Sequence, residues 1–421
     1  MVPGVRAQHR RPRRRRSRAP WRLAWTIAWV LLSPSLAHAR ADTPIVELVT
    51  IGPGDDLFSR WGHVGLRVRA DGEDHMYSYG YAVDGGFGQL VALVRGKALF
   101  RLAARPWTTA LPWYQRRDRH MESQALQLPP SQLRALVQRL RIESRPINRD
   151  FVYDSLRTNC STRLRDLLDD VSRGALRRAA EDYAPGRTLR TDTRAAAASS
   201  VFVGIGLDVL VGAHQDTVPT GWASMYRPAD LQAIATATRL EGGDPLLGPV
   251  EVIIASERPP ATPPTPRATM WLLLLAAVAA ALIAWTRPGT HPTKGYRIGM
   301  LVLATVGVLS CLLGLLVAVT MAVATVPSLA HNENVLVFVP LDAAAVVVAV
   351  RGWRGRGSSE RLRKIGRAYV HVRLVVLAAL LVAKVLGLAP QDNLILVVAA
   401  AIVLASLAFA TRPSRSHAKE I

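Results

Sequence analysis

Two residues far apart in the sequence, Cys160 and His63, could together carry out thiol chemistry. Asn159 precedes the cysteine and predicts a helix that begins at Cys160, because asparagine is a good N-cap residue. A thiol at the first helical position lies near unpaired backbone N–H groups and the positive end of the helix dipole, which favour the thiolate. The imidazole of His63 could accept and return a proton. We therefore predict a cysteine nucleophile, with backbone N–H groups of Cys160 and Asn159 as oxyanion donors.

Each of these residues also has a plainer interpretation. A single cysteine on an amphipathic helix is by default a small core residue, and a strand histidine is more often structural than catalytic. The second cysteine, Cys311, lies inside a long apolar run and needs no function. The segment Gly52-Pro53-Gly54-Asp55 is read as a turn, since it lacks the residues of a phosphate-binding loop.

The elements that must position these residues predict an α+β domain over residues 42–256. Strand patterns occur in residues 45–51, 62–68 and 75–80, and helical spacing occurs in residues 131–142 and 160–171. Strands gathered first and helices later are typical of this fold class. Asp71-Gly72 predicts the turn between the second and third strands. Gly62 is expected to let the helix come close to His63.

The net charge of +22 is concentrated outside this domain. Residues 1–22 hold nine arginines, and residues 268–421 hold fifteen Lys and Arg against five Asp and Glu, which leaves +3 for the region between. We therefore expect no nucleic-acid partner, because no domain is basic enough to bind one.

The flanking segments predict export and a membrane anchor. Residues 1–39 have a basic stretch, an apolar stretch and an A-x-A site at their end, as in a signal peptide or signal anchor. Five prolines predict a stiff linker over residues 257–268.

Residues 269–411 are expected to form a helical membrane domain. Its five apolar runs are residues 270–286, 299–326, 335–350, 368–389 and 394–410. Lys and Arg cluster in alternate loops and in the tail at 412–421, which predicts that residues 42–268 lie on the outer side of the membrane and that the C-terminus is cytoplasmic.

Three charged residues lie within these runs. Asp342 and Lys384 are predicted at similar depth, and we expect them to pair, because intramembrane charges usually pair or serve a site. Arg373 is expected to snorkel to the inner surface. His331, Glu333 and Asn334 are expected to face the catalytic domain as candidate substrate-binding residues.

Several motifs in this order resemble the DUF4105 or Lnb-type periplasmic domain, which is related to circularly permuted NlpC/P60 papain-like proteins. The matching stretches are residues 49–55, Gly62-His63, residues 77–80, Tyr153-Asp154, residues 159–168, Gly212, Asp216, residues 227–231 and residues 331–340.

The resemblance implies a lipoprotein N-acyltransferase with a permuted papain-like fold. Such an enzyme moves an acyl chain from a phospholipid, through a cysteine thioester, to the N-terminal amine of a lipoprotein. Cys160 would be the nucleophile and His63 the base. His75 would orient the imidazole, with Tyr79 or Tyr77 as the alternative. No metal-ligand spacing or dinucleotide motif occurs, so we expect no cofactor and no metal.

Two other functions fit the same residues. One is an NlpC/P60-like cell-wall peptidase or amidase, which would use the same thiol for hydrolysis. The other is a non-catalytic envelope scaffold in which Cys160 is simply buried. The five apolar runs favour a lipid-handling role, since a cell-wall enzyme would need a single anchor.

Overall fold

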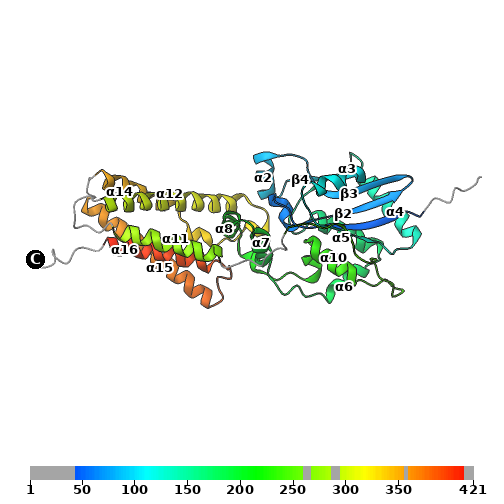
Figure 1. Ribbon diagram of the computed structural model, residues 1–421. Helices are drawn as coiled ribbons and strands as arrows, with labels where there is room; N and C mark the ends of the chain where they lie inside the picture. The colour runs from blue at the N-terminus through cyan, green and yellow to red at the C-terminus, as the bar shows by residue number, and fades with distance from the viewer. Residues whose placement is uncertain (1–42, 259–266, 286–293, 355–358, 412–421) are drawn as a thin grey trace, which may run out of the picture. The chain divides into compact units, whose positions relative to one another are not determined.

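The computed structural model describes residues 43–258, 267–285, 294–354 and 359–411 (Figure 1). The predicted signal segment at 1–39, the prolines of the linker and the tail at 412–421 lie outside the described residues, so these predictions stay untested.

The N-terminal part is built on a seven-stranded antiparallel sheet with the strand order β6-β4-β3-β2-β1-β5-β7. Its strands are β1 (Ile45–Ile51), β2 (His63–Ala70), β3 (Glu73–Ala82), β4 (Leu99–Pro106), β5 (Met121–Ala125), β6 (Asp150–Val152) and β7 (Glu251–Ile254). The three predicted strands are confirmed as β1, β2 and β3. They lie side by side in the middle of the strand order.

A tight hairpin fixes the register of β2 against β3. Asp71 and Gly72 have φ values of 54° and 77°, the left-handed conformation that a two-residue hairpin turn requires. Ala70 therefore pairs with Glu73, and Leu66 pairs with Tyr77. Counting back along both strands brings His63 opposite Gly80.

The same part of the chain contains helices, and some of them cover the two faces of this sheet. The helices are η1 (Leu57–Trp61), α2 (Gly86–Val94), α3 (Trp107–Gln115), α4 (Pro130–Glu143), α5 (Cys160–Val171), α6 (Ala175–Glu181), α7 (Leu189–Ala197), α8 (Val201–Leu210), η2 (Ala213–Asp216), α9 (Gly221–Ser224) and α10 (Pro228–Ala237). The predicted helices are confirmed as α4 and α5. Leu164, Leu167 and Leu168 of α5 are fully buried against β2 and β3. On the other face, Trp107 and Tyr114 of α3 pack with Met76. Together these elements form a mixed α/β domain.

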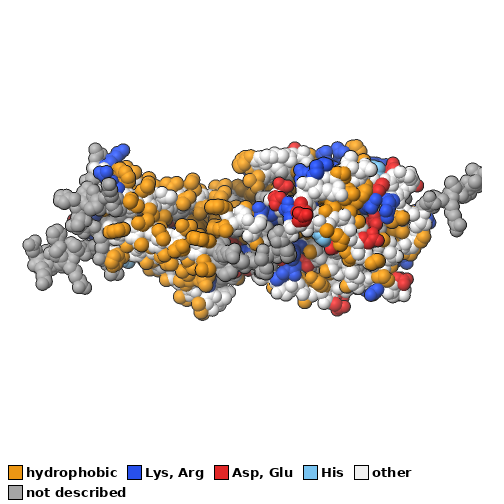
Figure 2. All heavy atoms as spheres, in the orientation of Figure 1, with side chains coloured by type: hydrophobic (Ala, Val, Ile, Leu, Met, Phe, Trp, Pro, Cys, Tyr) orange, Lys and Arg blue, Asp and Glu red, His pale blue; other side chains and the backbone are white. Residues whose placement is uncertain are grey.

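The C-terminal part consists of apolar helices. They are α11 (Arg267–Ala284), α12 (Lys294–Val323), η3 (Pro327–Leu329), α13 (Asn334–Val337), η4 (Pro340–Ala343), α14 (Ala344–Trp353), α15 (Glu360–Val385) and α16 (Leu394–Ala410). Figure 2 shows hydrophobic side chains over these helices, whereas charged side chains gather over the sheet domain. Among the described residues, α12 and α15 are long and apolar enough to cross a membrane. The segment 327–353 is a third candidate, bent by 42°, whereas the apolar parts of α11 and α16 are shorter. Five full spans remain a prediction.

The predicted pairing of Asp342 with Lys384 is wrong. Asp342 accepts hydrogen bonds from Ser310 and Tyr369 and lies 3.3 Å from Arg373. Lys384 pairs with Glu333 at 2.7 Å. Depth along a helix follows from its rise per residue, but the direction of a side chain around the axis does not. The helical path also breaks at Pro340, which turns Asp342 away from Lys384.

Arg373 does not snorkel. It is 5% exposed, and its guanidinium donates to the carbonyl oxygens of Leu336 and Val337 as well as to Asp342. These two carbonyls lie at the end of α13, where the helix stops and leaves acceptors unpaired. Arg373 therefore stabilises the bend between α13 and α14.

Candidate active site

Helix α5 begins at Cys160, as the sequence predicts. The Asn159 side chain accepts hydrogen bonds from the N–H groups of Ser161 and Thr162, both at 2.9 Å. In return, the Thr162 hydroxyl accepts from the Asn159 N–H at 2.8 Å, which completes a capping box. This corrects one expectation: the Asn159 N–H is occupied and cannot serve as an oxyanion donor. The backbone N–H of Cys160 stays as the candidate.

The start of α5 is also fixed to a segment that lies 64 to 67 residues further along the chain. The Asn159 amide donates to the carbonyl oxygen of Tyr226 at 2.9 Å, and the Ser161 hydroxyl donates to that of Met225 at 2.6 Å. Asn159 also donates to Ser155, in the loop before the helix. Each of these bonds limits the rotation of the helix start, so the position of the thiol is set from both sides.

Buried ion pairs hold that downstream segment in place. Asp192, 4% exposed, accepts from Arg187 at 2.6 Å, from Arg227 at 2.7 Å and from the Tyr226 hydroxyl at 2.9 Å. Asp230 pairs with Arg187 at 2.5 Å. We call Arg187, Asp192, Arg227 and Asp230 the Asp192 network. Burial alone would lower the pKa of Arg187. Its hydrogen bonds to Asp192 and Asp230 and the charges of these carboxylates raise the pKa by more, so it lies above its usual value.

The thiol of Cys160 is mostly buried, and its surroundings raise its pKa. Burial is the largest cause and raises the pKa to about 11, while hydrogen bonds from the backbone of Val64, Ser161 and Cys160 itself lower it. The expected lowering of the thiol pKa by the helix start is therefore present, but it is smaller than the increase caused by burial. The contact with Val64 places the sulfur beside the residue that follows His63.

Aromatic side chains from two elements lie near the same thiol. A charge on Cys160 would raise the pKa of Tyr114, on α3, and of Tyr153, which precedes the loop before α5. Tyr114 belongs to the same face of the sheet as Met76, whereas α5 packs on the opposite face. The sulfur therefore lies at the end of β2, within the electrostatic reach of groups from both faces.

His63 is the first residue of β2, and its ring lies against β3. Its Nε2 is hydrogen-bonded to the Ser78 hydroxyl at 2.5 Å. A Cβ atom on Gly80 would lie 2.5 Å from Cε1 of the ring, so only glycine leaves room for the imidazole there. Gly62 serves another purpose: its φ of 86° and the nearby Ile51 carbonyl exclude a side chain, and the expected contact with the helix plays no part.

The imidazole is kept neutral by its surroundings. Burial lowers the pKa of His63 to about 4, and the positive charge of Arg119 lowers it as well. Arg119 is 4% exposed and donates through Nε to the Gly52 carbonyl at 2.7 Å. A neutral imidazole whose Nε2 bonds Ser78 has Nδ1 left to accept a proton. At neutral pH both groups therefore favour their neutral forms, a thiol at Cys160 and an imidazole at His63.

The residues predicted to orient His63 lie elsewhere. His75, Tyr77 and Tyr79 alternate with Ser78 along β3 and so point to the opposite face from His63. The Tyr79 hydroxyl donates to Glu143, and His75 lies 3.9 Å from Glu73. Ser78 was missed, although the Asp71-Gly72 turn contains the signal. A two-residue turn fixes the pairing of β2 with β3, and the pairing decides which residues share the face of His63.

Two of the three predicted substrate-binding residues, Glu333 and Asn334, have structural partners. The Asn334 side chain donates to the carbonyl oxygens of Asp208 and Val209, at the end of α8, and Glu333 pairs with Lys384. His331 is exposed, with a φ of 49°. Asn334 thus satisfies the free end of a helix. Gly212 belongs to the same junction, because a Cβ there would lie 2.0 Å from the Ala330 carbonyl oxygen.

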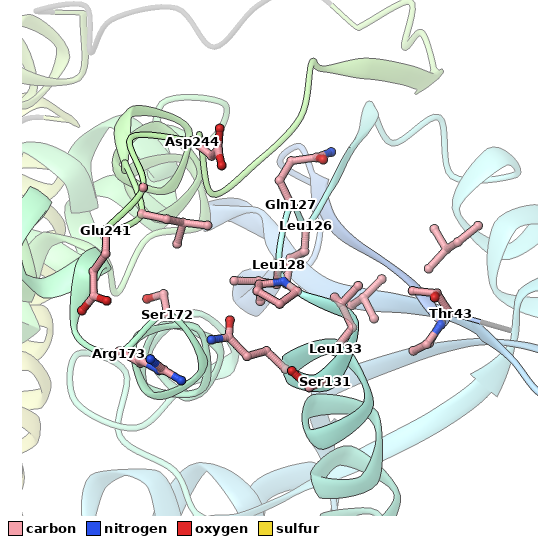
Figure 3. A pocket seen from close by; sticks show the side chains of 17 residues that line it. Thr43, Leu126, Gln127, Leu128, Ser131, Leu133, Ser172, Arg173, Glu241 and Asp244 are labelled. Carbon is pink, nitrogen blue, oxygen red and sulfur yellow. The ribbon is translucent and has the colours of Figure 1, made fainter. Parts of the chain in front are cut away.

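One cavity lies away from Cys160. It has a volume of about 690 Å³ and is lined by residues such as Thr43, Leu128, Arg173 and Glu241 (Figure 3). Arg173 follows the far end of α5, and at 1.5 Å per residue this end is roughly 20 Å from Cys160. We therefore do not assign this cavity to the thiol site. Within the described residues, no group of three His, Cys, Asp or Glu side chains could hold a metal ion.

Among the comparisons with known proteins, only the one with family models gives a match. Neither the curated proteins nor the solved structures contain a match to this chain, so the papain-like relation stays a prediction. Residues 35–196, which include His63, Ser78 and Cys160, match the family model described as the Lnb N-terminal periplasmic domain. This stretch of the chain is thus similar to the periplasmic domain of Lnb-family membrane proteins.

Proposed function

We propose that the protein is a membrane-bound periplasmic cysteine acyltransferase. In this proposal it moves an acyl chain from a phospholipid to the N-terminal amine of a lipoprotein, through a thioester on Cys160. The main support is the thiol at the start of α5, next to the strand end that carries a neutral His63. The match to the Lnb periplasmic domain and the apolar C-terminal helices support a lipid substrate.

The first half of the reaction would form the thioester. Nδ1 of His63 takes the thiol proton as the sulfur attacks the ester carbonyl carbon of the lipid. The backbone N–H of Cys160 stabilises the negative oxygen that forms. The C–O bond then breaks, and the departing lipid alkoxide takes the proton from the imidazolium, which leaves the acyl group on sulfur.

The second half would transfer the acyl group to an amine. The lipoprotein amine attacks the thioester carbon, His63 removes a proton from the attacking nitrogen, and the C–S bond breaks. The proton then returns to the sulfur, so the enzyme is regenerated. Ser78 accepts from Nε2–H and holds the ring in the tautomer that both steps require.

The resting charges suit this sequence of steps. Because burial keeps both groups neutral, charge separates only as the carbonyl carbon is attacked. A site that disfavours charge also contains little water, which favours transfer to an amine over hydrolysis of the thioester.

An acyl-transfer assay would test the proposal. The full-length protein in lipid nanodiscs receives a phospholipid with isotope-labelled acyl chains and a synthetic diacylglyceryl peptide with a free N-terminal amine. We expect a labelled amide on the peptide, detected by mass spectrometry, and none with the Cys160→Ser variant or with an N-acetylated peptide. Release of free fatty acid without amide, or cleavage of cell-wall peptides instead, would support a hydrolase and contradict the proposal.

A further inference from the structure

Helix α2 has its polar and apolar sides exchanged relative to an ordinary surface helix. Its nine residues carry no charge. Phe87 is 79% exposed and Leu90 is 49% exposed, whereas Gln89 is 6% exposed. Both polar atoms of the Gln89 side chain are buried without a hydrogen-bond partner. A helix in water turns its apolar side inward, so the exposed side of α2 fits an apolar environment.

Helix α8 is similarly apolar and joins the core of the C-terminal helices. Its side chains are uncharged before Asp208, and Phe202 is 88% exposed. Near its other end, Val209 is 2% exposed and belongs to one apolar cluster with Val317 of α12 and Val337 of α13. The apolar surface of α8 is therefore continuous with that of the candidate membrane-spanning helices.

Both helices are fixed at the end of the apolar helical region. Thr325 lies two residues after the end of α12, and its hydroxyl donates to the carbonyl oxygen of Arg95, directly after α2, at 2.8 Å. Asn332 donates to the carbonyl oxygens of Val209 and Leu210 in the last turn of α8. Helix α12 is long and apolar enough to span a membrane. These contacts therefore attach α2 and α8 to the end of a candidate membrane-spanning helix.

The same two helices are connected to the elements of the thiol site. Helix α2 follows β3, the strand of Ser78 and Gly80. Arg60 donates to the Ser199 hydroxyl at 2.6 Å, which ties the start of α8 to the residues just before His63.

A row of aromatic rings leads from an exposed position toward the thiol. Phe58, in η1, is 52% exposed and meets the edge of Phe100, with ring centres 6.4 Å apart. Phe100 stacks on Tyr153 at 4.2 Å, and Tyr153 lies within the electrostatic reach of Cys160. Aromatic rings of this kind suit contact with an acyl chain, because they offer large apolar surfaces.

We propose that α2 and α8 insert their exposed apolar side chains into the membrane leaflet next to the periplasmic domain, and that the acyl chain of a membrane lipid reaches Cys160 along Phe58, Phe100 and Tyr153. The occupant is lipid, since the surface is continuous with helices suited to the bilayer and lacks charge for a polar partner. The insertion stands independently of the proposed function, whereas the acyl route rests on it.

The insertion is tested without any activity measurement. In a Cys160→Ser, Cys311→Ser background, a fluorescent label is attached to the single cysteine of Phe87→Cys, Phe202→Cys or Ile147→Cys. Ile147 is 90% exposed and follows α4, so it is the matched control. In nanodiscs with lipids brominated on the acyl chain, we expect about twofold or stronger quenching at positions 87 and 202 and none at 147, as for side chains in the acyl region. Equal emission at all three positions would overturn the insertion.

The acyl route is tested by comparing two substrates. The variants Phe202→Asp and Phe87→Asp should lower acylation of Cys160 from bilayer phospholipid by about tenfold or more, because a charge opposes insertion. Acylation by a water-soluble short-chain thioester should stay unchanged, which shows that the site is intact. Equal loss with both substrates, or equal loss in Ile147→Asp, would contradict the route. If the wild-type protein is never acylated, the proposed function fails, while the quenching result still decides the insertion.

Discussion

The start of α5 lies between two groups of ionisable side chains. One group stays charged, and the other is kept neutral by burial. In the Asp192 network each carboxylate meets two arginines, so the charges stay, and the pKa of Arg187 is raised. At the Cys160–His63 site no such pairing occurs among the described residues. Burial there raises the pKa of the thiol and lowers that of the imidazole.

The difference separates the positioning of the site from its chemistry. Paired charges with several hydrogen bonds fix the geometry, and here they fix residues 225–227, which hold Asn159 and Ser161. Unpaired groups that burial keeps neutral are suited to proton transfer, because charge appears only during the reaction. Changes in the Asp192 network should therefore affect mainly stability, and changes at the Cys160–His63 site should affect mainly the reaction.

The largest effect is expected at His63. The variant His63→Gln removes the proton acceptor and should lower the rate of Cys160 acylation by about 10³-fold, a typical contribution of general base catalysis. The matched control is His75→Gln on the neighbouring strand, which should react at the wild-type rate. Stopped reactions analysed by intact mass give both rates. Equal rates in the two variants would remove His63 from the mechanism.

The Asp192→Asn variant should weaken the fold more than the chemistry. It removes the buried carboxylate that Arg187 and Arg227, both partly buried, share, and we expect the free energy of unfolding to fall by roughly 3 kcal/mol. The control is Asp71→Asn, which breaks an exposed pair with Arg141 and should cost less than about 1 kcal/mol. Denaturant unfolding followed by tryptophan fluorescence measures both. A similar loss in the two variants would show that the network does not stabilise the domain.

Ser78 is expected to have a smaller effect, because it acts through the imidazole. Ser78→Ala frees Nε2 and should slow acylation by about tenfold without changing the KM for lipid, and Ser78→Thr, which keeps the hydroxyl, should restore part of the rate. The imidazole should also titrate differently in Ser78→Ala, which histidine NMR signals would show. An unchanged titration and an unchanged rate would mean that Ser78 only fills space.

The pH dependence of stability and of Cys160 alkylation should show whether His63 and Cys160 are neutral. The pKa of His63 is about 4 in the folded protein and 6.5 in the unfolded chain, so the unfolded chain binds the extra proton between these values. The free energy of unfolding should therefore decrease as the pH falls from 6.5 to 4, and less steeply in His63→Gln. Alkylation of Cys160 should accelerate toward a pKa of about 11. A plateau of alkylation already at pH 7 would reveal a thiolate and contradict the neutral site.

Much of the central fold follows from local patterns in the sequence. Apolar β-branched residues revealed β1, alternation revealed β2, and the turn at Asp71-Gly72 led to β3. The Asn159 cap with apolar residues at helical spacing revealed α5. Strands β4, β5, β6 and β7 were not predicted. They are short or carry several charged residues, so their alternation is weak and pairing with neighbours decides their structure.

The site could be predicted only in part, because its details depend on non-local geometry. The helix start at Cys160 is local, whereas the pKa of the thiol depends on burial by distant elements, which outweighs the local helix effect. The role of Ser78 required the pairing of β2 with β3, and the partners of Asp342 and Lys384 required the direction of each side chain around its helix. The spacing of residues within one segment determines neither the pairing of strands nor the direction of a side chain around its helix.

The most direct test of the central claim is the mass of the protein after incubation with phospholipid. If Cys160 and His63 form a reactive pair, the wild-type chain should gain the mass of one acyl group, and hydroxylamine should remove it. The Cys160→Ser variant should gain no hydroxylamine-labile mass, and His63→Gln should gain it about 10³-fold more slowly. Absence of the adduct in the wild-type protein, or an adduct on another residue that persists in Cys160→Ser, would contradict the account.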